Sequence, residues 1–357
     1  MIRILLFSRY GRLGASSRVR FFQYLPYLEA HDIRVTVSPL LDDGYLQRLY
    51  AKQGRPSFSV IRAYAHRLAD LINSAGYDLL WIEKELFPFL PAWVETMLHA
   101  RGIPYVVDYD DAIFHGYDQH PRKLVRTLLG RKIDRVMRAS ALVIAGNDYL
   151  AAYARLAGSG RVEYLPSVVD IDRYLPAPLN TERVFTIGWI GSPSTTGYLE
   201  QIGPALAEVC RSGRARLVLV GADDIALPGV PLEIRPWSED SEVAAIQSFD
   251  AGIMPLPDTP WERGKCGYKL IQCMACGLPV VAAPVGVNRQ IVDHGINGFH
   301  AADLDEWLQA LVTLRDNHEQ RRAMGQAARE KTVTEYSLQA NGPRLLELLN
   351  SAIRGGR

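Results

Sequence analysis

Short runs of apolar, mostly branched residues recur along the chain and alternate with stretches of mixed polarity. The first run, 2–7, is followed by a loop that contains glycine and serine, and the run at 185–190 is followed by a similar loop. A buried strand, such a loop and a helix begin a βαβ unit. Because strands alternate with helices throughout, the pattern predicts an α/β fold with two parallel sheets, each flanked by helices. Further strands are predicted at 34–37, 79–82, 105–107, 141–145, 217–220, 251–254 and 279–282.

The middle of the chain contains a break in both structure and charge. Two prolines one residue apart stop regular structure within a linker predicted at 174–180. Residues 1–180 contain 23 basic and 18 acidic side chains, whereas 181–357 contain 17 and 21. We therefore predict one domain over 1–178 and another over 182–337. Ligands of open α/β sheets bind beyond the carboxyl ends of the strands, so we expect two Rossmann-like, doubly wound domains that face a central cleft.

Composition limits the class of protein. A length of 357 residues corresponds to about two domains. Forty Lys and Arg against 39 Asp and Glu give a net charge of +1, which argues against a nucleic-acid partner held by charge. No apolar run approaches the ~20 residues that span a bilayer, and 1–7 is too short for a signal peptide. Four cysteines do not make a disulfide framework, so we expect a reduced, cytoplasmic protein.

The segment 261–281 combines a glycine-containing loop, a short helix that ends at Gly277 and a buried strand that begins at Pro279. The loop would bring together backbone N–H groups, Lys265, Lys269 and the positive end of a helix, which suits a phosphate. An alternative interpretation is a plain loop–helix–strand connection with solvated lysines.

The run 274–281 in this segment, together with 284–288 and 297–299, resembles the donor-binding domain of retaining glycosyltransferases of family 4. The resemblance implies a GT-B fold in which a carboxy-terminal helix at about 338–357 packs back on the first domain. It also implies a UDP- or GDP-sugar donor, an acceptor hydroxyl on a glycan or lipid-linked molecule, and a role in glycan, glycolipid or polysaccharide biosynthesis. No metal or other cofactor is implied, because helix dipoles and lysines stabilise the leaving diphosphate. The matching pieces are 166–170, 188–191, 250–255, 274–281, 284–288, 297–299 and 322–325.

Two glutamates of that family are replaced here. By the resemblance, the first contacts the donor sugar and the second binds ribose, and their positions hold Gly264 and Gln272. The Gln272 amide can still hydrogen-bond a ribose hydroxyl. The usual Arg and Lys pair after the first strand of the second domain is also absent, so Lys265 and Lys269 are predicted to supply the cationic contacts.

The predicted donor-binding residues lie in loops and at helix starts. Residues 192–196 either cap a helix or face the donor pyrophosphate. Trp237 follows a short strand and either stacks on the nucleotide base or anchors the core. The full set is Gly191, Ser192, Thr195, Trp237, Lys265, Cys266, Gly267, Tyr268, Lys269 and Gln272.

An acidic cluster follows the predicted strand at 105–107 and supplies the predicted catalytic residues. Asp110 or Asp111 would orient or deprotonate an acceptor hydroxyl, and His115 could do the same near neutral pH. One alternative is the Asp-x-Asp metal motif of the other glycosyltransferase fold, GT-A, formed by Asp108 and Asp110. Another is helix capping by Asp110 or Asp111.

Two further segments of the first half suggest acceptor contacts. Gly11, Gly14 and Arg18 form a loop that could hold an acceptor or donor phosphate. The segment 121–138 interleaves basic and apolar residues around Gly130, which we expect to interrupt it. It would lie either on an anionic membrane, giving a peripheral protein, or as a solvated helix face.

Other assignments remain as alternatives. Cys266, Cys273 and Cys276 are expected to be core residues rather than zinc ligands, because no fourth ligand is evident nearby. An enzyme of the same architecture, such as a nucleotide-sugar epimerase or a phosphorylase, is one alternative function. A catalytically inactive donor-binding or assembly subunit is another, which the replacements at 264 and 272 favour.

Overall fold

The computed structural model describes residues 1–51, 57–176 and 184–355 and divides into two compact units. Residues 177–180 of the predicted linker lie outside the described residues, and the chain leaves the first unit at Ser167. The first unit comprises Met1–Ser167, Gly264–Cys266 and Asn341–Arg357, and the second comprises Val168–Arg263 and Gly267–Ala340.

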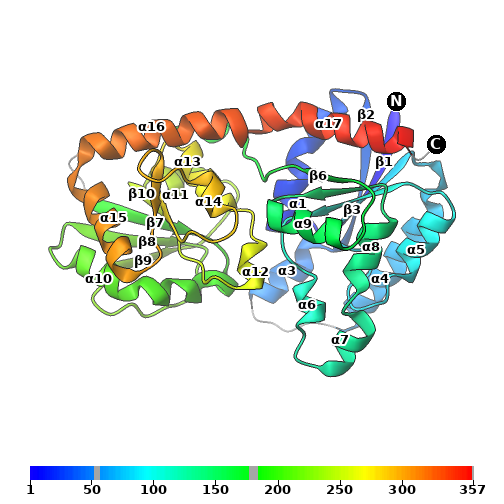
Figure 1. Cartoon of the computed structure of the whole chain (residues 1–357), viewed down its shortest axis with the longest axis horizontal. Helices are drawn as coiled ribbons and strands as arrows, with labels where there is room; N and C mark the ends of the chain where they lie inside the picture. The colour runs from blue at the N-terminus through cyan, green and yellow to red at the C-terminus, as the bar shows by residue number, and fades with distance from the viewer. Residues whose placement is uncertain (52–56, 177–183, 356–357) are drawn as a thin grey trace. The chain divides into compact units, whose positions relative to one another are not determined.

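The first unit contains a parallel six-stranded sheet in the order β2-β1-β3-β4-β5-β6 (Figure 1). The apolar run that begins the chain forms β1, in which Ile4 to Phe7 are buried between two neighbouring strands. Ile4 pairs with Val35 on one side and Leu79 on the other. The strands are β1 (Ile2–Tyr10), β2 (Ile33–Leu41), β3 (Leu79–Glu83), β4 (Tyr105–Tyr109), β5 (Leu142–Ala145) and β6 (Val162–Tyr164).

Helices cover this sheet. Helices α2 and α4 pack on β2, helix α9 packs on β5 and β6, and helix α5 packs against α8. The last helix, α17, rests Gly342 on the Tyr27 ring and joins Arg344 to Glu163 at 2.7 Å. The helices are α1 (Ala15–Arg20), α2 (Leu25–Glu29), α3 (Asp43–Tyr50), α4 (Ser57–Ile72), α5 (Trp93–Ala100), α6 (His115–Asp118), α7 (Lys123–Leu129), α8 (Lys132–Ala139), α9 (Asp148–Leu156) and α17 (Leu338–Gly355).

The second unit contains another parallel six-stranded sheet, in the order β12-β11-β10-β7-β8-β9. Both predicted parallel sheets are therefore confirmed. Phe185 to Ile190, the apolar run predicted to open this half, is buried as β7 near the centre of the sheet. The strands are β7 (Phe185–Ile190), β8 (Ala215–Val220), β9 (Leu232–Arg235), β10 (Ala251–Met254), β11 (Val280–Ala282) and β12 (Gly298–His300).

Helices flank the sheet of the second unit and pack on one another. Helix α13 packs on β10 and β11 and against α16, whereas α10 packs on β8 and against α15 (Figure 1). Within the described ranges, no helix is both long and apolar enough to cross a membrane. The helices are the 3₁₀ helix η3 (Pro193–Ile202), α10 (Gly203–Cys210), α11 (Glu242–Gln247), α12 (Pro260–Arg263), α13 (Tyr268–Ala275), α14 (Asn288–Ile291), α15 (Leu304–Asp316) and α16 (His318–Glu335).

The strand order fixes where each sheet can hold a ligand. In the first unit the chain order reverses between β1 and β3, and in the second between β7 and β10. At such a switch point the connections leave in opposite directions and open a crevice beyond the carboxyl ends of the two strands. The residues that follow β1, β3, β7 and β10 are therefore the first place to search for a site.

Gly188 in β7 tests the packing of the second sheet. A Cβ atom added there would lie 1.9 Å from the Phe249 ring. Gly188→Ala should therefore lower the free energy of unfolding by about 3 kcal/mol, because a buried core cannot absorb the extra methyl group. Gly197→Ala is the matched control, since no described atom lies within 4 Å of its added Cβ, and it should change stability by less than about 0.5 kcal/mol. Urea unfolding measures both, and equal stabilities would contradict this packing.

Candidate functional site

A buried lysine stands at the switch point of the first sheet. Lys84 directly follows β3 and adopts a left-handed backbone conformation with φ of 67°, which is costly for a residue with a side chain. Its Nζ lies 2.7 Å from Asp110 Oδ1 and 3.6 Å from Asp111 Oδ2. Burial alone would lower the pKa of Lys84, but the two carboxylates outweigh it and raise the pKa above its ordinary value. Lys84 is therefore held as a cation beside the predicted catalytic aspartates.

The two aspartates serve ion pairs rather than a helix cap. Burial opposes ionisation of Asp110, yet Lys84 outweighs it and lowers the pKa of that carboxyl. Asp111 Oδ1 lies 2.8 Å from Lys265 Nζ. Helix α6 begins after Phe114 and has no side-chain cap, so the helix-capping interpretation of this cluster is wrong for α6.

Asp108 is fully engaged inside the first unit. Both of its carboxylate oxygens accept hydrogen bonds from the Arg20 guanidinium, at 2.8 and 3.1 Å, and both side chains are buried. Each acid of the Asp-x-Asp motif thus has its own cationic partner, Arg20 or Lys84. Among the described residues, no group of three or more His, Cys, Asp or Glu side chains is arranged to hold a metal ion.

His115 belongs to a different group of side chains. Its Nδ1 lies 3.0 Å from Asp118 Oδ1, and its Nε2 lies 2.8 Å from the Tyr149 hydroxyl. The ring also packs edge-on against Phe114. The three predicted catalytic residues are therefore divided between a lysine-bound pair of aspartates and a histidine held by Asp118 and Tyr149.

The predicted anion loop at Gly11, Gly14 and Arg18 already holds a carboxylate of the chain. A Cβ atom on Gly11 would lie 2.4 Å from Asp43 Oδ1, and the same oxygen accepts a hydrogen bond from Leu13 N at 2.9 Å. Gly14 precedes helix α1, and Arg18 is buried with Nη1 donating to Arg12 O. Asp43 therefore stands where this loop would receive a phosphate.

At the switch point of the second sheet, Lys269 reaches the end of β7. Its Nζ donates to Thr195 Oγ1 at 3.0 Å and lies 4.1 Å from the centroid of the Trp189 ring. A Cβ atom on Gly191 would lie 2.4 Å from the same nitrogen, so only glycine leaves room for it. Gly191, Thr195 and Lys269, all predicted from the sequence, are brought together here.

The helices that border this point begin without a side-chain cap. Ser192 precedes η3 and its hydroxyl contacts the Ser194 hydroxyl rather than a backbone N–H of the helix, so the capping interpretation does not hold for Ser192. Gly267 precedes α13 with φ of 65°, a conformation that favours glycine. The α13 N-terminus and its first-turn residue Lys269 therefore give this edge of the sheet a positive potential.

Gln272 lies in a buried network that the sequence does not reveal. Its Nε2 donates to the Tyr174 hydroxyl at 2.8 Å, and that hydroxyl donates to Glu242 Oε1 at 2.7 Å. The half-buried Trp237 donates Nε1–H to Glu242 Oε2 at 3.0 Å, and the Tyr268 hydroxyl lies 3.5 Å from that of Tyr174. Glu242 thus ties three predicted donor residues together.

The short segment 264–266 belongs to the first unit although the chain on both sides belongs to the second. A Cβ atom on Gly264 would lie 2.4 Å from that of Ala112, so this position has no room for the glutamate of the family. Asn147 Nδ2 donates to Lys265 O at 2.9 Å and lies 3.8 Å from Cys266 Sγ. Cys266, Cys273 and Cys276 are buried free thiols, and Lys265 is engaged by Asp111.

Sequence reasoning missed Lys84 and Glu83. Burial raises the pKa of the Glu83 carboxyl, whose Oε2 accepts hydrogen bonds from Arg9 N and Ser17 Oγ. The signal was available, because charged residues follow the apolar run at 79–82 as they follow the run at 105–107. Glu242 and Arg20 gave no such signal, because neither follows an apolar strand: Arg20 ends α1 and Glu242 begins α11.

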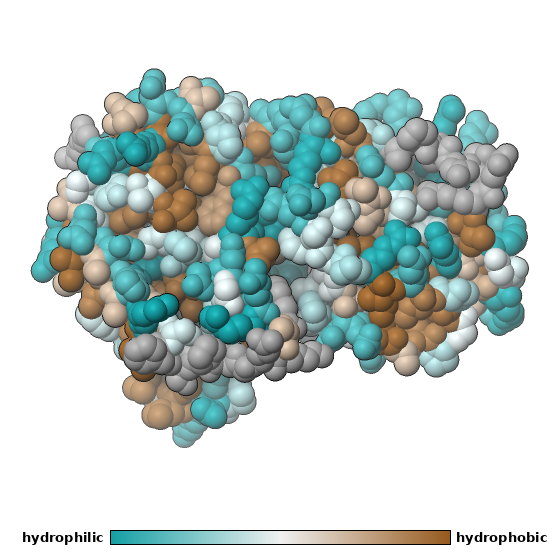
Figure 2. Space-filling view, turned by 180° about the vertical axis from the view of Figure 1, so that it is seen from behind, coloured by the Kyte–Doolittle hydropathy of each residue, from teal (hydrophilic) through white to brown (hydrophobic). Residues whose placement is uncertain are grey.

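The basic segment 121–138 forms two helices, α7 and α8, separated near Gly130 as predicted. Figure 2 shows apolar side chains at the tip that Figure 1 labels α7. Leu124 and Leu128, one turn apart, are 69% and 63% exposed. Lys132 is not part of the basic surface, because it is buried against Glu85 at 2.5 Å.

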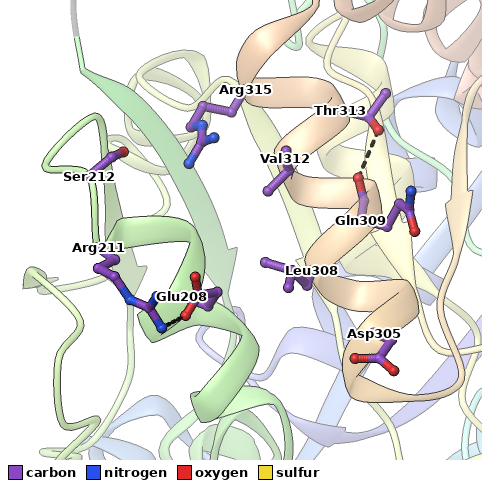
Figure 3. A pocket seen from close by; sticks show the side chains of 9 residues that line it. All are labelled: Glu208, Arg211, Ser212, Asp305, Leu308, Gln309, Val312, Thr313 and Arg315. Atoms are coloured by element: carbon purple, nitrogen blue, oxygen red, sulfur yellow. Dashed lines mark hydrogen bonds and ion pairs between the residues drawn. The ribbon is translucent and has the colours of Figure 1, made fainter.

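A depression of the second unit lies away from both switch points. It has a volume of about 780 Å³ and lies between α10 and α15 (Figure 3). Three of the charged residues that line it have partners within the protein, because Arg211 pairs with Glu208 and Arg315 pairs with Asp316. None of the predicted site residues lines it.

The part of the sequence that matches a family model lies almost entirely in the second unit. Residues 181–317 match the family model described as Glycosyl transferases group 1. Sulfoquinovosyl transferase SQD2 of Arabidopsis thaliana is 28% identical over 229 residues, which cover 57% of this chain and 42% of the relative. The chain spans less than half the length of the curated relatives it matches.

Solved structures resemble the chain along nearly its whole length. Sucrose-phosphate synthase from Thermosynechococcus elongatus has a TM-score of 0.75 at 15% identity, covering 99% of this chain and 100% of its own. Anabaena Alr3699/HepE in complex with UDP-glucose has a TM-score of 0.68 at 17% identity, covering 98% and 100%. The chain therefore has the GT-B fold of these proteins, and its second unit carries the match to the group 1 glycosyltransferases.

Proposed function

We propose that the chain is a glycosyltransferase that moves a sugar from a nucleotide-sugar donor to an acceptor hydroxyl. The observation that carries this proposal is the position of Lys269. Its ammonium group lies beside Gly191 at the switch point of the second sheet, within the residues that match the group 1 family model. A cation at this edge suits a diphosphate leaving group.

The donor would be a UDP-sugar, as in the Anabaena structure solved with UDP-glucose. As the bond from the anomeric carbon to the diphosphate breaks, negative charge grows on the diphosphate oxygens. Lys269 and the α13 N-terminus stabilise that charge with preformed dipoles, which lowers the barrier. Trp237 and Gln272 would contact the nucleoside, and Glu242 would hold both side chains in place. We propose retention at the anomeric carbon and no metal requirement.

The acceptor would bind the first unit, where Asp110, Asp111 and His115 supply the groups that handle a hydroxyl. A carboxylate oxygen of Asp111 can accept a hydrogen bond from the acceptor and orient it. The His115 imidazole, held by Asp118 and Tyr149, can receive the proton. Lys84 holds the Asp110 side chain in place by an ion pair and keeps that carboxyl ionised.

Product analysis with labelled UDP-glucose and GDP-mannose tests the function. Transfer to a glycan or lipid-linked acceptor would support the proposal. An isomerised nucleotide sugar would indicate an epimerase, and transfer of the sugar to inorganic phosphate would indicate a phosphorylase. Donor binding without turnover would indicate an inactive donor-binding subunit, in keeping with the lack of space at Gly264.

The donor assignment predicts the behaviour of Lys269→Ala. Loss of the ammonium group should weaken UDP binding by about 1.5–3 kcal/mol, the value of a hydrogen bond to a charged group. Lys331→Ala is a matched control, because Lys331 also belongs to the second unit and pairs with Asp293. Calorimetry should show unchanged affinity for the control. Wild-type affinity in Lys269→Ala would contradict the assignment.

The acceptor assignment predicts a different result for Asp111→Asn and His115→Ala. Both should lower the transfer rate about 100-fold while UDP affinity stays constant, because general acid–base groups act on the acceptor hydroxyl. Melting temperatures of the same samples separate this effect from unfolding. Normal transfer rates in both variants would remove these residues from the acceptor site.

We also propose that α7 binds the surface of an anionic membrane, which would deliver a lipid-linked acceptor. Leu124 and Leu128 can enter the interface while Arg122, Lys123 and Arg126 face lipid headgroups. The exposed pair lies on a helix with basic residues at both ends and beside it. This combination supports a membrane contact over a plain solvated face.

The double variant Leu124→Ser, Leu128→Ser should bind vesicles of phosphatidylglycerol at least about tenfold more weakly, because two apolar side chains no longer leave water. Leu156→Ser is the control, since Leu156 is 87% exposed on α9 of the same unit. Co-sedimentation measures all three proteins. Equal binding would leave α7 a solvated surface helix.

A further inference from the structure

A small pocket lies at the edge of the first sheet, between α3 and α4. It has a volume of about 290 Å³. Its floor is the carboxyl end of β2, at Pro39, Leu40 and Leu41, and its walls come from the two helices. Arg62 and Ala63 lie three and four residues after Ser59, and His66 lies four and three residues after them, so α4 presents one face to the pocket.

The walls of this pocket are rich in nitrogen donors. Arg48 on α3 and Arg62 and His66 on α4 line it, together with Tyr45. The acidic residue of the lining, Asp42, is engaged as the cap of α3, where Oδ1 accepts from Tyr45 N at 2.8 Å. Within the described ranges, neither Arg48 nor Arg62 has a carboxylate partner. The pocket therefore contains two guanidinium groups and one carboxylate, which already accepts a hydrogen bond as the cap of α3.

A buried arginine fixes the wall that carries these donors. Arg67, next to His66 on α4, is 2% exposed and donates to Ser38 O at 2.9 Å and to Ser8 O. Ser8 and Ser38 lie near the ends of the neighbouring strands β1 and β2. This clamp holds α4 over the strand ends, so the pocket is formed before any ligand arrives.

We infer that this pocket binds an oxyanion group, such as a phosphate monoester, carried by the acceptor. Planar guanidinium groups bind phosphate, sulfate and carboxylate through paired N–H donors. The neighbouring glycine loop lies at the same sheet edge, since Gly11 N donates to Leu41 O at 3.1 Å. Asp43 occupies that loop, so the cationic pocket one strand away is the better anion site.

That the anion belongs to the sugar acceptor rests on the proposed glycosyltransferase function, whereas anion binding by the pocket does not. The acceptor hydroxyl would be handled near Asp111, and the oxyanion of the same molecule would be held at the edge of the sheet. An acceptor with an anionic substituent would then be selected over its neutral analogue, because the two exposed guanidinium groups of Arg48 and Arg62 can pair with the anion and make no such bond to the neutral molecule.

Calorimetry with inorganic phosphate and with glucose 6-phosphate, at constant ionic strength, tests the site in the full chain. Arg48→Gln and Arg62→Gln should each weaken binding of both probes at least about tenfold, the effect of a lost charge-assisted hydrogen bond. Arg34→Gln is the matched control, because Arg34 is an exposed arginine near the start of the same β2 strand. It should change the affinity less than about twofold.

A second comparison separates this pocket from the proposed donor site. If phosphate binding is lost in Lys269→Ala and kept in Arg62→Gln, phosphate binds at the donor site and the inference is wrong. Unchanged affinity in the double variant Arg48→Gln, Arg62→Gln also overturns it. If the pocket variants alone lose phosphate and no sugar transfer is detected with any donor, the anion site stands and the proposed function fails.

Discussion

Parallel strand pairing is the constraint on which the candidate sites depend. It brings all carboxyl ends of a sheet to one edge, and the reversal of strand order opens that edge at a single point. In the first sheet this point lies between β1 and β3, and in the second between β7 and β10. A lysine side chain reaches each of them: Lys84 directly after β3, and Lys269 from the first turn of α13.

The two lysines are held in different ways, and the difference suits different tasks. Lys84 is buried, strained in its backbone and bound to Asp110, so it organises a charged cluster within the first unit. Lys269 is half-buried and contacts a hydroxyl and an aromatic face. A lysine that contacts a hydroxyl and a ring can turn to a phosphate at modest cost, whereas breaking a buried ion pair is expensive. This contrast supports an acceptor role for the first cluster and a donor role for the second.

The sequence predicted the sheets well because buried parallel strands are continuous apolar runs, as at 2–7 and 185–190. It missed β6 and β12, whose three residues each include a polar side chain, Glu163 or His300, and so form no apolar run. Gly191, Thr195 and Lys269 were found because loop and helix-start signals are local. Glu242 and Lys84 were not, because their roles depend on partners far away in sequence. The sequence shows that Gly264 stands where the family has a glutamate. Only the packing of Gly264 on Ala112 explains why a larger side chain is absent there.

A crystal structure of the chain with UDP would test the central claim, that the second switch point binds the donor diphosphate. The account predicts diphosphate oxygens within about 3 Å of Lys269 Nζ and of the backbone nitrogens that follow Gly191, with Lys269 released from Thr195. It also predicts the uracil ring beside Trp237. A diphosphate bound away from β7 and α13, with the Lys269–Thr195 hydrogen bond intact, would contradict it.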